Sequence, residues 1–551
     1  MPSRKCSYDA IIVGAGHNGL TAAALLAGKG LSVLVVESKD FVGGLAANYE
    51  PWPGFTAPLG AYVLGLFPRW LMKEAGIEGR IRLVPRDPGM TVLLGEGKAV
   101  RIYSNVDRTS REISRFSESD ARRYVEWARV WDLAGRVLEE VYSHPPEPAS
   151  HLLEEIVRVS RLPVIGGRVE EYLNMASWML VSPARRILEE WFESWETRSA
   201  LVEDALVGEL AGPSTPGTGV VLAHHYLGVS TGVRGEWAHV KGGMGALSEA
   251  LAKSVVERGG RIVLGRRVER IVVNGPGEVV GVELNGGEKC FARRGVLWSA
   301  SVKTLVSALR DHIDRTLRRR IEALDSDGAS SKVILGWRGS LKPLKEYSWL
   351  GGEIYRSSVV VMPGLEYAER AYGDALYRGI SREPWLSINV LTDLDPGLAP
   401  EGWNLASIFI QYTRHSSRSW NADDRAEVLD NTLNTISHYL DTSGMREVRA
   451  EVLTPRDYSE FGNPGGHIFQ LSLKLDQTYF WRPLPELSSY RFSPLKRLYI
   501  AGSSAHPGGG VSGLPGYLAA RALLEDLGIV KKRRIDPVMI ARRLIGGVLG
   551  L

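Results

Sequence analysis

The chain has 551 residues, enough for roughly two to four domains. Hydrophobic residues make up 44% and charged residues 24%, which excludes a disordered chain and predicts a globular protein with a substantial core. The net charge is only +4, so nothing in the charge favours a nucleic-acid partner. The two cysteines, Cys6 and Cys290, form no CxxC, which excludes a disulfide-rich scaffold, a dithiol redox centre and a cysteine-rich metal site.

The first predicted elements form a strand, a glycine turn, a helix and a second strand. Residues 8–13 (YDAIIV) are typical of a buried parallel strand, and GAGHNG follows at 14–19. An alanine- and leucine-rich helix comes next, and a second apolar strand over 31–36 leads into Glu37. This order of elements predicts a dinucleotide-binding unit far more strongly than a GxGxxG alone.

Each motif residue has a physical reason. Gly14 permits the tight turn, Gly16 lets the backbone approach a pyrophosphate, and Gly19 lets the helix pack close to the strand. The helix N-terminus offers free N–H groups and a partial positive charge to phosphates. Glu37 can accept hydrogen bonds from ribose hydroxyls and would repel a 2′-phosphate.

A second glycine pair narrows the choice of dinucleotide. Gly43 and Gly44 follow Glu37 closely, a pattern typical of FAD proteins of the glutathione-reductase and amine-oxidase type.

Further along, KGGMGAL at 241–247 precedes an amphipathic helix and short strands. Residues 110–200 are mostly helical by pattern.

Residues 330–475 contain alternating apolar runs that favour a half-buried antiparallel sheet. The runs are SKVILGW, WLSINVL, ASIFIQY and HIFQLSLKL. Nearer the C-terminus, a short strand ends at Gly502, and a glycine-rich loop then leads to a helix that starts near Leu514. We expect this second loop-to-helix corner to point its helix N-terminus at the same cofactor as the first.

These motifs carry a resemblance to a known family. GAGHNGL, E-x5-GG, PGF, GGMGAL and AGSSAHPGGGVSG resemble the phytoene-desaturase-related FAD oxidoreductases, in particular the branch typified by pyridine nucleotide-disulfide oxidoreductase domain-containing protein 2. The resemblance implies an α/β fold, with a discontinuous Rossmann-like FAD-binding domain interleaved with an α+β substrate domain on an antiparallel sheet. The expected FAD-binding segments are 1–75, 236–305 and 490–530, the substrate domain with its helical cap is 76–235 and 306–489, and a basic amphipathic tail is 531–551.

The resemblance also implies which residues contact FAD. Val268 would place backbone groups against the adenine, and Ser503 stands where many related flavoproteins carry an acid. The second helix N-terminus would stabilise the reduced flavin through its positive potential. The expected contacts are Gly14, Ala15, Gly16, Asn18, Gly19, Glu37, Ser38, Gly43, Gly44, Val268, Ala300, Gly502, Ser503, Gly513 and Leu514.

The function implied is an FAD-dependent oxidoreductase of the dehydrogenase or desaturase type. A hydride would pass from an apolar substrate to flavin N5, and oxygen or a quinone would reoxidise the flavin. The implied substrate is apolar and isoprenoid or carotenoid-like. Carotene desaturation itself is only one option, because Pro58 stands where the desaturase run GF-x-x-D-x-G has its acid. A flavin amine oxidase and a non-enzymatic prenyl or lipid carrier resembling Rab GDP-dissociation inhibitor stay open as alternatives.

Single residues add few further candidates. His506, between the last strand and the glycine-rich loop, is the candidate catalytic acid or base, with a structural histidine as the alternative. His224 and His225 have no third ligand at a metal spacing, so the sequence predicts no metal site. Cys290 is interpreted as a small packed residue in a hairpin.

The tail and the location are the last predictions. Residues 531–551 are basic and then apolar, so they could lie on an anionic membrane or dock on the protein itself. No run reaches about 18 apolar residues, and residues 1–8 are too short for a signal peptide. We therefore expect a cytoplasmic protein, with peripheral membrane contact as an option, and the sequence does not give the oligomeric state.

Overall fold

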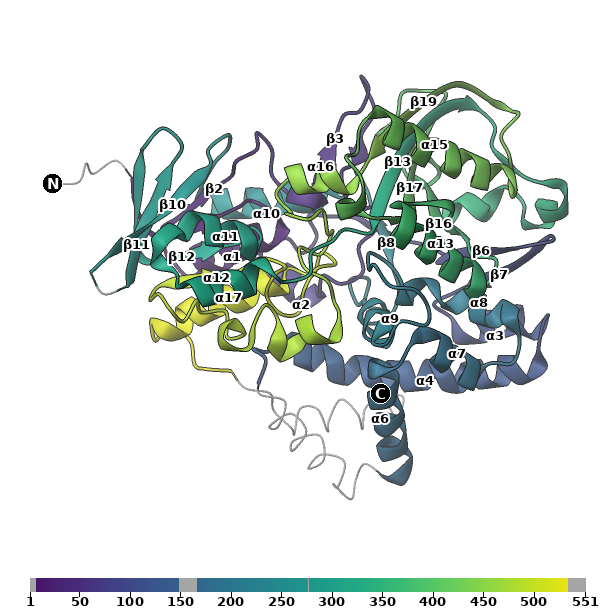
Figure 1. Cartoon of the computed structure of the whole chain (residues 1–551), viewed down its shortest axis with the longest axis horizontal. Helices are drawn as coiled ribbons and strands as arrows, with labels where there is room; N and C mark the ends of the chain where they lie inside the picture. Colours follow the sequence, from purple (N-terminus) through teal and green to yellow (C-terminus); the bar gives the residue numbers. More distant parts are fainter. Residues whose placement is uncertain (1–5, 148–165, 276, 534–551) are drawn as a thin grey trace.

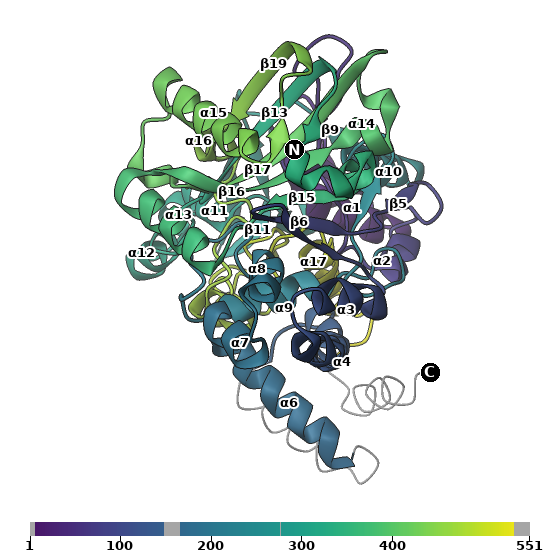
Figure 2. The ribbon, with the colours of Figure 1, turned by 90° about the vertical axis from the view of Figure 1, so that its right-hand side faces the viewer.

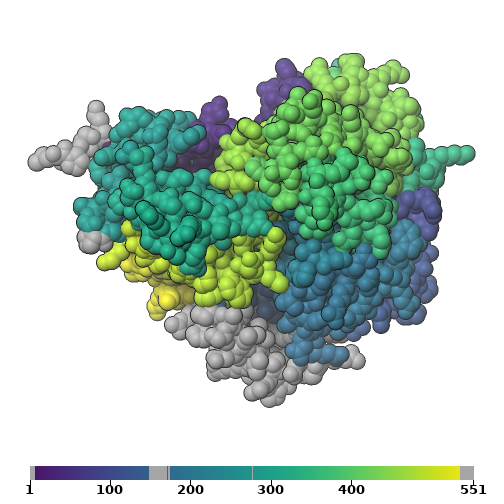
Figure 3. Space-filling view, in the orientation of Figure 1, coloured from purple at the N-terminus to yellow at the C-terminus, as the bar shows by residue number. Residues whose placement is uncertain are grey.

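The computed structural model describes residues 6–147, 166–275 and 277–533, arranged as two lobes that adjoin each other (Figure 1). Each lobe contains one seven-stranded sheet. The teal and yellow segments of one lobe lie against the green and blue segments of the other in the space-filling view (Figure 3). Because N-terminal, middle and C-terminal segments all contribute strands to the first sheet, the two lobes are interleaved in sequence, as expected.

The first sheet has the order β10-β11-β12-β1-β2-β9, and β20 also pairs with β12. The pairs β1–β2, β1–β12, β2–β9 and β12–β20 are parallel, whereas β10, β11 and β12 form an antiparallel meander. The strands are β1 (Ser7–Val13), β2 (Val33–Val36), β9 (Arg261–Val263), β10 (Val268–Asn274), β11 (Glu278–Leu284), β12 (Lys289–Trp298) and β20 (Leu498–Ile500). All of them fall in the segments expected to bind FAD, while the exact domain boundaries stay a prediction.

The core of this lobe explains the apolar runs. The residues of β2 are all buried, as is typical of a parallel strand covered on both faces. The helices of this lobe are α1 (His17–Gly28), α2 (Arg69–Glu74), α10 (Gly245–Glu257), α11 (Val302–Leu309), α12 (Arg315–Glu322) and α17 (Leu514–Asp526). Helix α12 packs in this core although the sequence assigns it to the other domain.

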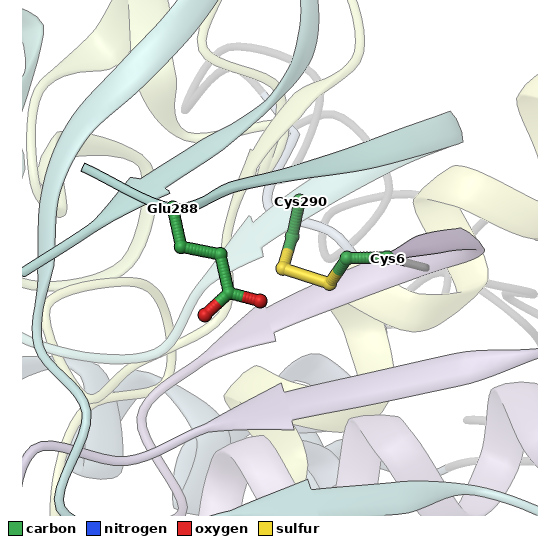
Figure 4. Close-up of side chains that lie close together, drawn as sticks. All are labelled: Cys6, Glu288 and Cys290. Carbon is green, nitrogen blue, oxygen red and sulfur yellow. A yellow bond between two sulfur atoms is a disulfide. The ribbon is translucent and has the colours of Figure 1, made fainter. Parts of the chain in front are cut away.

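The two cysteines correct one interpretation. Cys6 and Cys290 form a disulfide, so the reading of Cys290 as merely a packed residue is wrong. The bond joins the start of β1 to β12, where Phe291 N–H also donates to the carbonyl of Cys6. Glu288 lies beside the two sulfurs (Figure 4), but sulfurs bonded to each other are not thiolate ligands for a metal.

The second sheet has the order β19-β13-β17-β16-β15-β6-β7. It is antiparallel except for the parallel pair β6–β15, which the sequence did not predict. Its strands are β6 (Met90–Gly95), β7 (Lys98–Ile102), β13 (Ser330–Gly339), β15 (Ser358–Val361), β16 (Ile380–Val390), β17 (Trp403–Thr413) and β19 (Met445–Leu453). Short two-stranded sheets are formed by β3 (Asn48–Tyr49) with β4 (Ala57–Pro58), β5 (Leu83–Pro85) with β8 (Ala238–Val240), and β14 (Lys342–Pro343) with β18 (Leu440–Asp441).

One predicted strand is absent from this sheet. The run HIFQLSLKL forms turns, because the carbonyls of Phe469, Leu471 and Ser472 accept hydrogen bonds from the Arg482 side chain instead of from a neighbouring strand.

The second sheet separates two apolar environments. Val333 of β13, Ile388 of β16 and Ile408 of β17 share one core with α15 (Ala422–Ser437). Because side chains alternate along a strand, Lys332 and Phe409 point to the opposite face. That opposite face lies over the helical layer of the lobe (Figure 2).

The helical layer contains α3 (Val106–Ser114), α4 (Glu118–Tyr142), α6 (Gly166–Val181), α7 (Ala184–Trp191), α8 (Trp195–Leu201) and α9 (Thr218–Tyr226). The remaining helices of this lobe are α13 (Leu365–Arg378), α14 (Leu391–Leu394) and α16 (Pro455–Glu460). Within the described ranges, no helix combines the length and hydropathy needed to cross a membrane. Most of the predicted tail, residues 534–551, lies outside the described residues.

Candidate functional site

The first glycine loop has the geometry its sequence predicts. Gly14 adopts φ +100°, which favours glycine, and a Cβ on Gly19 would lie 2.0 Å from the carbonyl oxygen of Gly14. Only glycine therefore lets α1 approach β1 this closely. A Cβ on Gly16 would instead meet only the carbonyl oxygen of Gly43, at 4.0 Å, so the backbone at Gly16 has open space beside it.

The second glycine pair docks on this loop. Gly43 N–H donates to the carbonyl of Ala15 at 2.8 Å, and Gly43 and Gly44 both adopt positive φ. A Cβ on Gly43 would lie 2.7 Å from the hydroxyl of Ser248 in α10. The pair thus closes one side of the loop with backbone alone.

Glu37 is held at the end of β2 beside the same loop. Its Oε2 accepts a 2.6 Å hydrogen bond from Ala15 N–H, and its Oε1 accepts from Lys39 N–H at 2.9 Å and from the Ser38 hydroxyl at 3.1 Å. Arg266 N–H donates to the Glu37 carbonyl at 2.8 Å, two residues before Val268 begins β10. The carboxylate therefore stands where the ribose of a dinucleotide is bound in such folds.

The two ends of the chain meet at this loop. Asn18 Nδ2 donates a 3.0 Å hydrogen bond to Ser503 Oγ, although 485 positions separate the two residues. A Cβ on Gly516 would lie 1.9 Å from the carbonyl oxygen of Asn18, so α17 contacts α1 backbone to backbone. The predicted proximity of the two loop-to-helix corners is therefore observed.

Ala300 lies between the two corners. Its amide nitrogen would lie 3.4 Å from a Cβ added to Gly14. Its carbonyl oxygen would lie 2.9 Å from a Cβ added to Gly502. Gly513 adopts φ +69° just before α17, and as a glycine it offers no side chain to cap the helix. Leu514 N–H donates to the Ser512 hydroxyl at 3.2 Å.

The C-terminal corner depends on a residue that sequence reasoning missed. Arg482 is fully buried and donates to the Ser503 carbonyl through Nε at 3.0 Å and Nη2 at 2.7 Å. Its other hydrogen bonds go to carbonyls of residues 469–477. Burial lowers the pKa of Arg482 to about 10, and the nearby Glu209 carboxylate opposes this shift. Arg482 therefore fixes the backbone that presents Ser503.

The catalytic role of His506 stays a prediction, and the structure gives its surroundings. The imidazole is buried between the rings of Tyr142 and Tyr479, and its Nε2 lies 3.2 Å from the carbonyl oxygen of Val141. Burial lowers its pKa to about 3, and it is not among the described residues that line the cavity discussed below. These contacts favour the structural role that was its alternative.

Unpaired polar atoms mark the space beside the two corners. His17 Nε2 and Asn18 Oδ1 are buried and have no partner among the described residues. Burial lowers the pKa of His17 to about 4, so the ring is neutral at neutral pH. Together with the open space at Gly16, these atoms fit a bound dinucleotide that completes their hydrogen bonds. Contact of the individual residues with that cofactor stays a prediction.

A cavity of about 490 Å³ extends from these corners into the second lobe. His17, Ser503, Gly510 and Val511 line its end at the first lobe. Its other walls are mostly apolar and include Leu45, Ala61, Val63, Met90, Ile102, Val106, Phe409, Ile468 and Phe469. The sheet face opposite α15 thus forms one wall of the cavity.

Lys332 is the second residue that sequence reasoning missed. It is 1% exposed, lines the cavity, and donates from Nζ to the carbonyls of Pro58 and Gly60. Burial lowers its pKa to about 7. The sequence feature that could have revealed Lys332 is a lysine inside the apolar run SKVILGW. The alternation of side chains along β13 directs this lysine into the cavity.

Three further ionisable groups line the cavity. Burial raises the pKa of Tyr62 to about 12, and the Tyr62 ring centroid is 5.2 Å from Lys332 Nζ. Burial and the neighbouring Asp204 hold the pKa of Glu203 well above its usual range. Asp204 also has a raised pKa because it is buried, although His225 opposes the shift.

Comparisons with known proteins agree with this geometry. A family model described as flavin containing amine oxidoreductase matches residues 19–524. Pyridine nucleotide-disulfide oxidoreductase domain-containing protein 2 of Rattus norvegicus is 32% identical over 554 residues, covering 95% of this chain and 94% of that protein. A zeta-carotene-forming phytoene desaturase of Myxococcus xanthus is 26% identical over 94% of this chain and 93% of the relative.

Solved structures match the fold alone. Cyclohexylamine oxidase from Brevibacterium oxydans has a TM-score of 0.56 at 16% identity, covering 95% of this chain and 99% of that chain. These findings confirm the fold class and the resemblance inferred from the motifs. The chain belongs to the flavin-containing amine oxidoreductase family and is a flavin-dependent oxidoreductase.

Proposed function

We propose that the protein is an FAD-dependent oxidoreductase of the dehydrogenase or desaturase type that acts on a largely apolar substrate. The observation that carries the proposal is the cavity, because its walls join the dinucleotide corners to an apolar sheet face and to a buried lysine. An isoprenoid-like hydrocarbon fits the character of these walls.

The chain's own residues fit FAD at one end of the cavity. The loop at Gly16 would hold the pyrophosphate, Glu37 the ribose, and the start of α17 the flavin end, next to Ser503. Bound FAD would supply the hydride acceptor for the reaction.

The other residues would position the substrate and handle its proton. Apolar side chains such as Met90 and Phe409 would hold the substrate body and exclude water. Lys332 Nζ would accept or release a proton near neutral pH, since its pKa lies at about 7. The carbonyls of Pro58 and Gly60 fix the position of this nitrogen.

Amine oxidation is the weaker candidate. Glu203 and Asp204 are two acids of the cavity wall that could pair with a substrate ammonium. Their raised pKa values, however, favour the protonated acids, which attract a cation less than carboxylates do.

The test is anaerobic reduction of the purified holoenzyme by matched candidate substrates. We expect bleaching of the flavin absorbance by unsaturated isoprenoid or other apolar compounds and little by simple amines. Bleaching by amines alone would favour amine oxidation over oxidation of an apolar substrate. A purified protein that takes up no flavin would contradict the proposed function.

A further inference from the structure

The cavity contains a second cation that the proposed reaction does not use. Arg86 follows β5, is 3% exposed, and lines the cavity. Burial lowers its pKa to about 10, so the guanidinium stays charged at neutral pH. The cavity therefore holds a full positive charge within mostly apolar walls.

The described neighbours of Arg86 leave this charge without a counter-ion. Nη1 donates to Ser358 Oγ at 2.6 Å and to Asn389 Oδ1, and both acceptors are neutral. Within the described ranges, Nε is buried without a hydrogen-bond partner and no carboxylate forms an ion pair with Arg86. A buried cation is normally paired, because leaving water costs more than neutral acceptors return.

The neutral acceptors instead hold the guanidinium in a fixed orientation. Ser358 Oγ donates to Asn389 Oδ1 at 2.8 Å, and Asn389 Nδ2 donates to the Ser387 carbonyl at 3.2 Å. These side chains come from β15 and β16, so a rigid sheet supports them. They occupy Nη1 only, and the described residues provide no acceptor for Nε or Nη2. Because Nε is itself buried, Nη2 is the nitrogen left to donate to a group in the cavity, and a carboxylate is the acceptor that would also supply the missing negative charge.

Arg86 and Lys332 lie near the same tyrosine. The Lys332 ammonium is 5.2 Å from the Tyr62 ring centroid. The charge of Arg86 lowers the pKa of Tyr62, in opposition to the larger raising effect of burial. Arg86, Tyr62 and Lys332 all line the same cavity, so one ligand in it could contact both cations.

We propose that Arg86 binds the carboxylate of a substrate whose remaining body is apolar, such as a fatty or isoprenoid acid. This inference rests on the proposed function for its substrate. The subsite itself is a property of the folded chain, so its occupancy can be measured without turnover.

The experiment measures the binding of three probes with one alkyl chain and different head groups. Decanoate, 1-decanol and decylamine are titrated into the holoenzyme by calorimetry. We expect decanoate to bind about 10- to 100-fold more tightly than 1-decanol, as for a charge-assisted hydrogen-bonded pair. Arg86→Met should abolish this preference while 1-decanol binds as before, and Arg86→Lys should retain part of it.

Arg82→Met is the matched control, because Arg82 is exposed and lies four positions earlier in the same segment. It should keep the full preference for decanoate. The ratio of the two affinities within one variant does not depend on the amount of folded protein, so partial unfolding of Arg86→Met cannot imitate the expected result.

Two results would overturn the inference. One is equal binding of decanoate and 1-decanol, or a preference that survives in Arg86→Met. The other is tightest binding of decylamine with loss of that binding in Glu203→Gln. If a neutral apolar compound reduces the flavin but decanoate shows no Arg86-dependent preference, this inference alone is refuted. If decanoate binding depends on Arg86 but no apolar compound reduces the flavin, the proposed function alone is refuted.

Discussion

The glycine corners and the cavity wall are built in opposite ways. At the corners, Gly16 and Gly43 act through the absence of a side chain and through backbone N–H groups. At the wall, Lys332 and Arg86 act through long side chains that distant neutral acceptors hold in place. The first kind of site is local in sequence and general for dinucleotides, while the second is assembled from several strands and, in the proposed function, selects the substrate.

The largest expected effect tests whether the C-terminal corner depends on one side chain. Arg482→Met removes the donors for several buried carbonyls and takes a positive charge away from the neighbourhood of the buried Glu209 carboxylate. We expect a loss of about 3–5 kcal/mol in the free energy of unfolding. Chemical denaturation measures it, and a loss below about 1 kcal/mol would show that the corner does not need Arg482.

The next prediction compares two glycines of the first corner, one expected to affect stability and the other expected to affect flavin binding. Gly19→Ala should destabilise the protein by about 1–3 kcal/mol or more, because the new Cβ would clash with the Gly14 carbonyl. Gly16→Ala should leave thermal stability of the flavin-free protein nearly unchanged, yet weaken flavin binding by narrowing the space for a pyrophosphate. Equal flavin affinity in Gly16→Ala and wild type would contradict the position assigned to the cofactor.

A pH profile examines the cavity wall. Above a pKa of about 7 the Lys332 amine is neutral and can accept a proton, and below it the amine is charged. The anaerobic rate of flavin reduction should therefore rise about tenfold per pH unit below pH 7 and level off above it. Lys332→Met should flatten this profile, while Lys342→Met, an exposed lysine of the same lobe, should not. An unchanged profile in Lys332→Met would exclude the proton role.

The smallest effect concerns the contact between the two corners. Asn18→Ala removes the hydrogen bond to Ser503 Oγ and should cost about 1 kcal/mol of stability. Because the same contact sets the spacing of the corners, flavin affinity should fall by a few fold as well. Ser437→Ala, which removes an exposed hydroxyl of α15 in the other lobe, is the control. An equal loss of stability and of flavin affinity in both variants would show that the contact between Asn18 and Ser503 has no special role.

The sequence predicted the corners well because their determinants are local. Glycine spacing, a strand before the turn and Glu37 after the second strand specify the loop without tertiary information. The surroundings of His506 could not be predicted in this way, because proximity in sequence to a glycine loop does not show where a ring points, and here Nε2 points toward the carbonyl of Val141.

The cavity wall could not be predicted in the same way. Lys332 and Arg86 matter only because strand alternation and long-range pairing direct them into one cavity, and neither belongs to a spaced motif. The disulfide was missed for a similar reason, since 284 positions separate Cys6 from Cys290 and only the pairing of β1 with β12 brings them together.

The account rests on one flavin dinucleotide held by both corners. Its most direct test is release of the flavin from purified protein, followed by its identification and a count per chain, for wild type and for Glu37→Gln. We predict about one FAD per chain and no FMN in wild type, with FAD affinity reduced about 10-fold or more in Glu37→Gln. Bound FMN, no flavin after incubation with FAD, or an unaltered affinity in Glu37→Gln would contradict the central claim.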